Sequence, residues 1–264
     1  MVRAIADLYA LKSSPTELSR IARQGSGSAC RSLFGGYVAW EMGSAADGSD
    51  SVAVEVAPAS HWPEMRAVVL VASAEKKDVS STAGMQQTVA SSTLFAERVR
   101  STVPARMQAM KKAVADKDFA SFADLTMKDS NSFHATCLDT TPPIFYMNDT
   151  SRAAVRMVDM INEKEGRTVA AYTFDAGPNA VVYYLEKDEE QVAGVFKGVL
   201  GGKTGWEGQR GQKVKESALP EGAQIAADRL KEGISRIILT GVGEGPIKTQ
   251  EALIGEDGSV IDKA

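Results

Sequence analysis

Two apolar runs of strand length, separated by a short polar break, constrain the fold more than any other feature of this sequence. They lie in AAYTFDAGPNAVVYYL (170–185), where a Gly-Pro-Asn sequence supplies the residues of a turn. Asp175 stands beside the break. Because a carboxylate next to two buried strands is costly, Asp175 must be exposed at the turn, hydrogen-bonded there, or kept for chemistry. An Asx cap of the turn is the structural alternative to a chemical role.

Composition and charge exclude several classes of function. The chain has 264 residues, of which 44% are hydrophobic and 24% charged, so it can bury a sizeable core. A formal net charge of -4 offers no basic surface for a phosphate backbone, and no nucleic-acid partner is predicted. The apolar runs are of strand length and no basic segment precedes one at the N-terminus. We therefore predict a soluble, cytoplasmic protein without a membrane span.

The two cysteines indicate a reducing compartment. Cys30 and Cys137 are too few for a disulfide framework, and we expect packed thiols rather than a disulfide. Together with His61 and His134 they do not show the spacing of a metal site, so no metal cluster is predicted.

Periodicity predicts an α+β fold in which helices cover the sheets on one face. Val2, Ile5, Leu8 and Tyr9 share the core-facing side of an uncapped first helix, and Ser14 caps a second. The expected strands are 37–43, 51–57, 65–73, 168–174, 180–186 and 235–246. The expected helices are 94–119 with a break or kink at Pro104, 121–138, 151–166 ending at Gly166, and 188–200, followed by a polar insertion over 201–222.

Two further stretches contain residue types that bind anions. In RQGSGSACRSLFGG (23–36), Gly25 and Gly27 would let backbone N–H groups approach an oxyanion before a helix start, and Arg31 adds a cationic fork. In KKDVSSTAGM (76–85), the hydroxyls of Ser80, Ser81 and Thr82 lie at a strand-to-helix junction and could hold a phosphate. The structural alternatives are a flexible capped loop in the first stretch and ordinary N-caps in the second.

Four motifs follow one another in an order that resembles a known family. They are GSGSACRSLFGGYVAWE, KKDVSSTAGM, MKDSNSFHATCLDTTPPIFYMND and AYTFDAGPNAV. The sequence resembles the mevalonate diphosphate decarboxylases of the galactokinase–homoserine kinase–mevalonate kinase–phosphomevalonate kinase (GHMP) superfamily, most of all fungal versions. The resemblance covers nearly the whole chain. It implies a GHMP-superfamily fold, with 1–70 as the remainder of the N-terminal domain including the substrate loop, and 71–264 as the complete C-terminal domain.

The resemblance also implies a site, residue by residue. Asp175 falls on the family's catalytic aspartate and Arg31 on its active-site arginine. Four hydroxyl residues fall on substrate-binding positions, the last two beside the substrate's diphosphate: Ser26, Ser28, Ser81 and Thr82. The implied reaction is ATP-dependent decarboxylation of mevalonate 5-diphosphate to isopentenyl diphosphate in isoprenoid and sterol synthesis. ATP and Mg²⁺ are the implied cofactors, and a homodimer is the implied assembly.

The sequence departs from the family in one respect. The family's nucleotide loop, rich in Ser, Gly and Ala, has no counterpart here besides the substrate loop, so we expect a chain truncated at its start. Two alternatives therefore stay open: a catalytically inactive folded fragment or interaction domain, and a related GHMP small-molecule kinase. An exposed apolar patch along the first helix and near Trp40 is expected of such a fragment.

Overall fold

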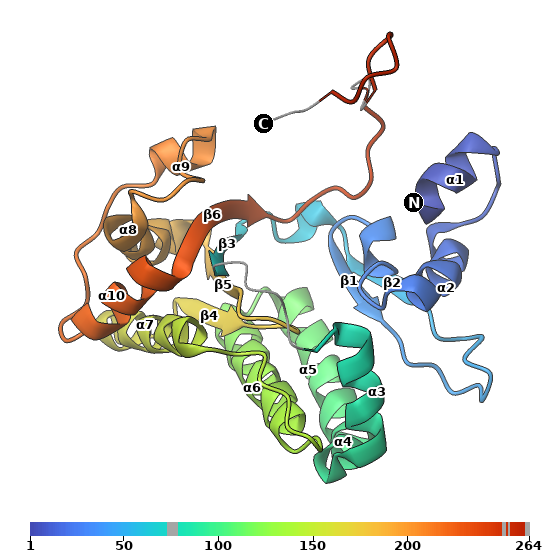
Figure 1. Cartoon of the computed structure of the whole chain (residues 1–264), viewed down its shortest axis with the longest axis horizontal. Coiled ribbons are helices and arrows are strands. Elements are labelled where there is room, and N and C mark those ends of the chain that lie inside the picture. Colours follow the sequence, from blue (N-terminus) through green and yellow to red (C-terminus); the bar gives the residue numbers. More distant parts are fainter. Residues whose placement is uncertain (73–78, 250–251, 253, 262–264) are drawn as a thin grey trace. The chain divides into compact units, whose positions relative to one another are not determined.

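The computed structural model describes residues 1–72, 79–249, 252 and 254–261, and Figure 1 follows the chain through its elements. The chain divides into two units, Met1–His61 with Val242–Ala264, and Trp62–Gly241. The domain boundary near residue 70 stays a prediction. Lys76, Lys77 and Asp78 of the second anion-binding stretch lie outside the described residues.

The first unit is a pair of short helices beside a two-stranded antiparallel sheet. Ser14 and Glu17 form the reciprocal hydrogen bonds of a capping box, which confirms the predicted start of α2. The strands β1 and β2 lie within the predicted strands 37–43 and 51–57, and they pair in antiparallel register. The elements of this unit are α1 Val2–Leu8, α2 Pro15–Gly25, a 3₁₀ turn Arg31–Leu33, β1 Tyr37–Trp40, β2 Ala53–Ala57 and a 3₁₀ turn Ala59–His61.

The orientation predicted for the first helix is wrong. Ala6 is the buried residue of α1, at 4% exposure, and it packs into a small cluster with Leu18 of α2. Leu8 and Tyr9 are 78% and 70% exposed. Periodicity places side chains on one face of a helix but does not determine which face meets the core. The apolar side of α1 is therefore solvent-exposed in this structure.

The second unit is built on a four-stranded antiparallel sheet in the order β4-β5-β3-β6. Its strands are β3 Met65–Ala72, β4 Ala170–Thr173, β5 Ala180–Leu185 and β6 Ile234–Gly241. Strands β4 and β5 form the antiparallel pair that the opening stretch predicted, with Thr173 opposite Val181. The turn between them carries Asp175.

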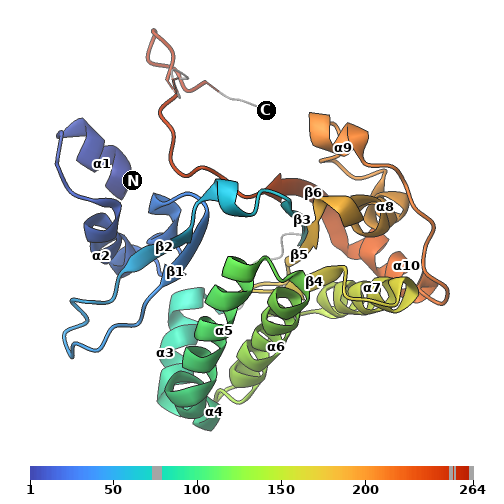
Figure 2. The same cartoon turned by 180° about the vertical axis from the view of Figure 1, so that it is seen from behind.

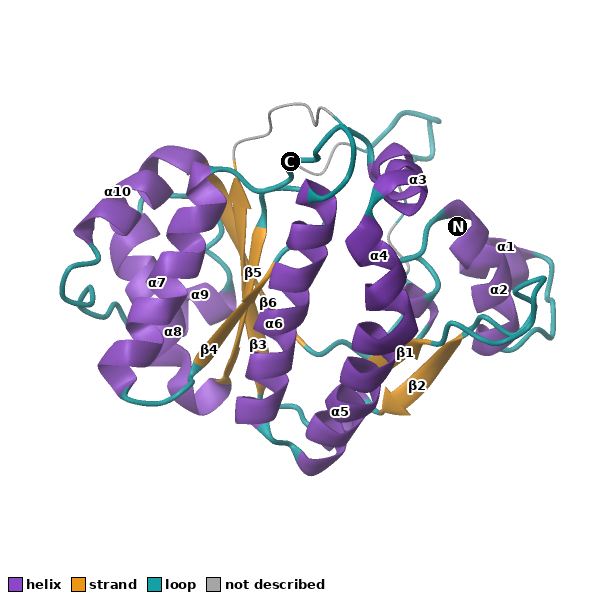
Figure 3. Ribbon diagram, turned by 90° about the horizontal axis from the view of Figure 1, so that it is seen from below, coloured by secondary structure: helices purple, strands orange, loops and turns teal. Residues whose placement is uncertain are grey.

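Helices flank this sheet on both faces, whereas the sequence predicted cover on one face (Figure 3). On one face Tyr184 of β5 is fully buried in the main core, together with Phe196 of α8. Successive strand residues point to opposite faces, and Tyr183 meets Phe122 of α6 with ring centroids 5.5 Å apart. Because AVVYYL is apolar throughout, both faces of β5 must be covered.

The helical segment between β3 and β4 is irregular just before Pro104, where a break or kink was predicted. A π-helical turn, Arg98–Thr102, joins α4 to α5, and Pro104 lies in the first turn of α5. Proline is tolerated there because it needs no helical N–H bond. The helices of this part are α3 Ser81–Ser91, α4 Thr93–Glu97, α5 Val103–Asp116 and α6 Phe119–Leu138, and both Figure 1 and Figure 2 show α5 beside α6.

The later helices were predicted in part. α7, Asp149–Glu165, ends at Gly166 with φ 62°, as predicted, and α8 is Glu189–Leu200. The sequence did not predict α9, Gln209–Lys213, or α10, Gln224–Gly233, and neither has a side-chain N-cap to signal its start. Among the described residues, no helix has both the length and the apolar character to cross a membrane.

Candidate active site

The turn that carries Asp175 is fixed on both sides of that residue. The backbone N–H of Phe174 donates to Ser130 Oγ of α6 at 3.1 Å. Beyond the turn, Ser151 Oγ of α7 donates to the carbonyl of Pro178 at 2.9 Å. Asn179 Oδ1 accepts from the N–H of Ala72, at the end of β3, at 3.0 Å. Two helices and a neighbouring strand therefore position this turn.

Asp175 itself is exposed, and its carboxylate forms no hydrogen bond or ion pair with any residue that the structure describes. Its backbone carbonyl accepts the N–H of Gly177 at 2.7 Å. An Asx cap would instead need a hydrogen bond from a backbone N–H to the carboxylate of Asp175, and no such bond is formed among the described residues. The turn is thus closed by its backbone, which leaves the carboxylate of Asp175 available to a ligand.

Two titratable side chains lie close enough to Asp175 to respond to its charge. Burial lowers the pKa of His134, while the nearby backbone of Phe174 and the charge of Asp175 act in the opposite direction. Burial raises the pKa of Tyr146, and the charges of Cys137 and Asp175 add to this effect. Burial therefore favours the neutral form of both His134 and Tyr146 near Asp175.

The N-terminus of α3 meets the same tyrosine. Tyr146 Oη donates to the carbonyl of Ser80 at 3.5 Å, and Ser80 caps α3 by accepting the N–H of Ala83. A Cβ at Gly84 would lie 2.2 Å from Tyr146 Oη, so only glycine leaves room for the phenol. Tyr146 thus lies between the first turn of α3 and the surroundings of Asp175. Sequence reasoning missed it because its partners lie far away in the chain.

Ser81 and Thr82 are the first two residues of α3, and both are exposed. Ser80, not either of them, is the N-cap, so the ordinary capping role does not account for their hydroxyls. The first N–H groups of an α-helix have no intrahelical partners, and its macrodipole favours negative charge there. This end of α3 can therefore offer hydroxyl and N–H donors to an anion.

The three remaining predicted site residues lie in the first unit, on the loop after α2. Ser26 and Ser28 are exposed with their Oγ atoms 3.1 Å apart, and Arg31 is exposed at the start of a 3₁₀ turn. The predicted helix start is only this three-residue turn. Gly27 packs on the ring of Trp40, where a Cβ would lie 2.6 Å from a ring carbon, so packing explains this glycine.

The six predicted residues form one group in each unit. Ser26, Ser28 and Arg31 belong to the first unit, and Ser81, Thr82 and Asp175 to the second. Their convergence on one ligand stays a prediction. Cys30 and Cys137 are buried free thiols, as expected, and burial raises the pKa of Cys137 to about 11.

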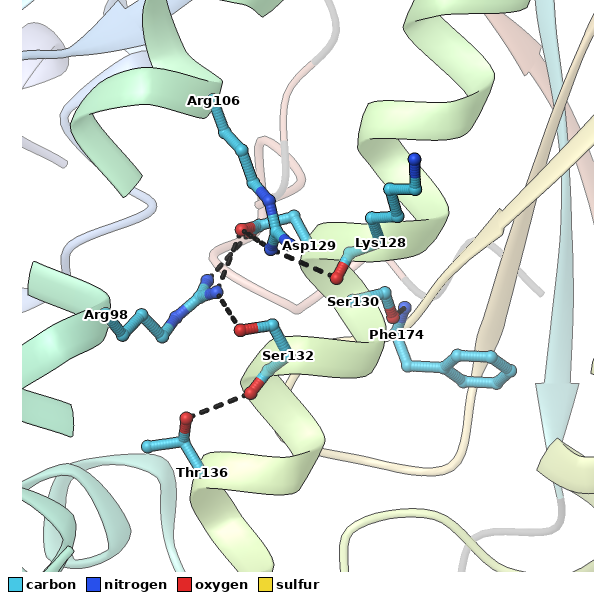
Figure 4. Close-up of polar contacts among 8 residues, drawn as sticks. All are labelled: Arg98, Arg106, Lys128, Asp129, Ser130, Ser132, Thr136 and Phe174. Atoms are coloured by element: carbon cyan, nitrogen blue, oxygen red, sulfur yellow. Dashed lines mark hydrogen bonds and ion pairs between the residues drawn. The ribbon is translucent and has the colours of Figure 1, made fainter. Parts of the chain in front are cut away.

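A network of charged side chains orients α6, the helix that supports the turn (Figure 4). The carboxylate of Asp129 accepts hydrogen bonds from both terminal nitrogens of Arg98, at 2.9 and 2.8 Å, and from one nitrogen of Arg106, at 3.1 Å. Arg98 also donates to Ser132 Oγ at 3.0 Å. Burial tends to raise the pKa of Asp129, but the hydrogen bonds and charges of Arg98 and Arg106 outweigh it and lower that pKa.

We expect Asp129→Ala to lower the free energy of unfolding at pH 7 by about 1–2 kcal/mol, since solvent partly screens the pairs. The matched control is Asp124→Ala on the same helix, which breaks an exposed pair with Lys128 and costs about 0.5 kcal/mol or less. Because the folded-state pKa of Asp129 is lowered, its contribution is complete above the ordinary pKa of about 3.9 and is lost below it. Urea unfolding of both variants from pH 7 to pH 3 measures their free energies of unfolding. Equal losses of unfolding free energy in Asp129→Ala and Asp124→Ala would contradict this prediction.

Comparison with known proteins identifies the family. The model of the mevalonate 5-diphosphate decarboxylase C-terminal domain matches residues 67–249, and that of the diphosphomevalonate decarboxylase-like N-terminal domain matches residues 1–53. The chain belongs to the mevalonate diphosphate decarboxylase family. This confirms the resemblance found in the sequence.

The relatives of this chain include fungal diphosphomevalonate decarboxylases. The diphosphomevalonate decarboxylase of Aspergillus fumigatus is 64% identical over 99% of the chain, and that of Saccharomyces cerevisiae is 54% identical over 96%. The chain spans 66% of the length of each of these relatives.

Solved structures confirm the GHMP-type α+β fold. A crystal structure of a mevalonate 5-diphosphate decarboxylase superposes with a TM-score of 0.86, at 51% identity, over 98% of this chain and 68% of that one. A structure of MDDEF in complex with MVAPP, AMPPCP and magnesium has a TM-score of 0.65, at 30% identity, over 71% of this chain and 56% of that one.

Proposed function

We propose that this chain acts in the ATP-dependent decarboxylation of mevalonate 5-diphosphate to isopentenyl diphosphate, in the mevalonate pathway of isoprenoid and sterol synthesis. The observation that carries the proposal is the free carboxylate of Asp175 on a turn fixed by α6, α7 and β3, in a member of this family. The proposal includes a cytoplasmic location and a homodimer.

Asp175 is the catalytic base of the proposed reaction. Its carboxylate orients the 3-hydroxyl of the substrate and takes up the hydroxyl proton as the phosphoryl group of ATP is transferred. Phosphate then leaves, and the carbon–carbon bond to the carboxylate breaks to release carbon dioxide. Positive charge develops on the tertiary carbon during this departure, and a nearby carboxylate stabilises it.

The other predicted residues bind and orient the substrate. Arg31 holds the substrate's carboxylate through its planar fork, and Ser26 and Ser28 contact the substrate. Ser81 and Thr82 bind the diphosphate at the N-terminus of α3, where hydroxyl and N–H donors point outward. Correct orientation of the reacting groups lowers the barrier by several kcal/mol, on the order of 7 when complete.

A relative's structure contains AMPPCP and magnesium, which supports ATP and Mg²⁺ as cofactors. The described residues contain no cluster of three acidic, histidine or cysteine ligands. We therefore assign no magnesium ligand to this chain and derive no step through the metal.

The test is turnover of mevalonate 5-diphosphate with ATP and Mg²⁺. We expect phosphate and carbon dioxide to be released in equal amounts, with isopentenyl diphosphate detected by mass spectrometry. A phosphorylated product without carbon dioxide would instead support the small-molecule kinase. Calorimetric binding of mevalonate 5-diphosphate without any turnover would support the inactive folded domain.

A further inference from the structure

The loop after α2 that carries the proposed substrate serines turns one residue inward. Ser26 and Ser28 are exposed with their hydroxyl oxygens 3.1 Å apart, whereas Gly27 between them is only partly exposed. The carbonyl of Gly27 accepts a hydrogen bond from the thiol of Cys30 at 3.0 Å, and Cys30 is fully buried. Because Gly27 is held from the protein side, its position determines where the two neighbouring hydroxyls lie.

The side chain of Trp40 lies against the same glycine. A Cβ at Gly27 would lie 2.6 and 3.0 Å from two carbons of the six-membered ring of the indole. Carbon atoms of different residues pack at about 3.5–4.0 Å, so Gly27 rests directly on the ring and leaves no room for a methyl group. The φ of Gly27 lies outside the left-handed region, so the ring, and not the backbone conformation, excludes a side chain here.

The ring of Trp40 is fixed in turn by a buried serine. Trp40 is the last residue of β1, and its Nε1 donates to Ser51 Oγ at 3.0 Å. Ser51 is 7% exposed, and its hydroxyl donates onward to the carbonyl of Glu41 at 3.1 Å. Trp40 also packs against the buried cluster around Leu18. An indole that is packed on one side and hydrogen-bonded at its N–H keeps one orientation, so it offers Gly27 a rigid surface.

We propose that Trp40, held by Ser51, is a positioning residue for the hydroxyls of Ser26 and Ser28. The ring sets the position of Gly27 and thereby presents both hydroxyls to the substrate at a fixed spacing. A displacement of about 1 Å in a binding group can cost as much as about 100-fold, so a rigid support under this loop has a measurable effect. The role rests on the proposed function, because it requires that Ser26 and Ser28 contact mevalonate 5-diphosphate.

A reciprocal pair of substitutions tests this role. Gly27→Ala adds a methyl group that overlaps the ring and displaces the loop, so we expect the dissociation constant of mevalonate 5-diphosphate to rise about 10-fold. Trp40→Phe removes the outer ring carbons that meet Gly27, and we expect a rise of about 3-fold from the lost support. In the double variant the methyl group fills the space that the indole leaves, so the dissociation constant should return to within about 3-fold of that of the unsubstituted protein. Independent effects would instead multiply to about 30-fold.

Calorimetry without ATP measures the dissociation constants, and urea unfolding measures the stability of each variant. Gly243→Ala is the matched control, because Gly243 is an exposed glycine of the same unit, where a Cβ meets nothing within 4 Å and φ is not in the left-handed region. We expect it to leave the dissociation constant unchanged. If Gly27→Ala does not fold, Ser51→Ala tests the same role, since it keeps the ring and removes only its hydrogen bond. We expect Ser51→Ala to raise the dissociation constant about 3-fold, and an unchanged value would overturn the role.

The outcomes separate this inference from the proposed function. If the unsubstituted protein does not bind mevalonate 5-diphosphate, the proposed function and the positioning role fail together. If it binds, and Gly27→Ala changes the free energy of unfolding but not the dissociation constant, the contact with Trp40 is packing alone. The positioning role is then overturned and the proposed function stands. Effects that multiply in the double variant overturn the positioning role as well.

Discussion

Asp175→Asn should abolish most of the turnover of mevalonate 5-diphosphate while leaving its binding nearly unchanged. Asparagine keeps the size of the side chain but cannot accept the proton of the 3-hydroxyl. A positioned general base contributes about 100- to 10,000-fold to a rate, and loss of a carboxylate near a developing positive charge moves the effect toward the upper end. The turn should remain intact because its fixing bonds come from Phe174, Pro178 and Asn179.

The measurements are kcat from phosphate release and the affinity for mevalonate 5-diphosphate from calorimetry. Asp228→Asn is the control, because this exposed carboxylate on α10 contacts other exposed surface residues, Gln224 and Lys231. A variant Asp175→Asn that folds, binds and retains most of the turnover would refute the catalytic role of Asp175.

The sequence correctly predicted the elements that are determined by residues close to one another in the chain. The capping box of Ser14 and Glu17 begins α2, and Gly166 ends α7, because each depends on backbone groups within one helical turn. The same holds for the strands on either side of Asp175, whose apolar runs and turn residues are contiguous.

The predictions that were wrong concern features that depend on contacts between distant segments. The periodicity of α1 was correct, but its buried face is set by the contact of Ala6 with the cluster around Leu18. The second covered face of β5 depends on Phe122, which packs against Tyr183, 61 positions further along the chain. No spacing rule connects such residues, so the sequence predicted a sheet covered on one face.

The candidate site divides in the same way. Motifs and family resemblance pointed to Asp175, Ser81 and Thr82, which lie in contiguous stretches. They could not reveal that Ser130 of α6 holds the turn, because its partner is the backbone N–H of Phe174, 44 positions further along the chain.

The largest stability effect is expected at Gly205, in the connection between α8 and α9. Its φ is +114°, a conformation that residues with a side chain rarely adopt, and a Cβ would lie 1.8 Å from the carbonyl oxygen of Ile237 in β6. The N–H of Ile237 donates to the carbonyl of Thr204 at 2.8 Å, so the two segments are held close by their backbones. Neither backbone can move away without breaking this bond.

Gly205→Ala should therefore lower the free energy of unfolding by about 3 kcal/mol or more, from backbone strain of about 1–3 kcal/mol and the added steric overlap. Trp206, at 6% exposure, should lose its fixed packing, so its fluorescence reports the change directly. The control is Gly202→Ala in the same connection, where a Cβ meets nothing within 4 Å and φ is not in the left-handed region. We expect that variant to stay within about 1 kcal/mol of the unsubstituted protein. Equal urea midpoints for the two variants would contradict this prediction. They would show that β6 and this connection can separate despite the hydrogen bond between Thr204 and Ile237.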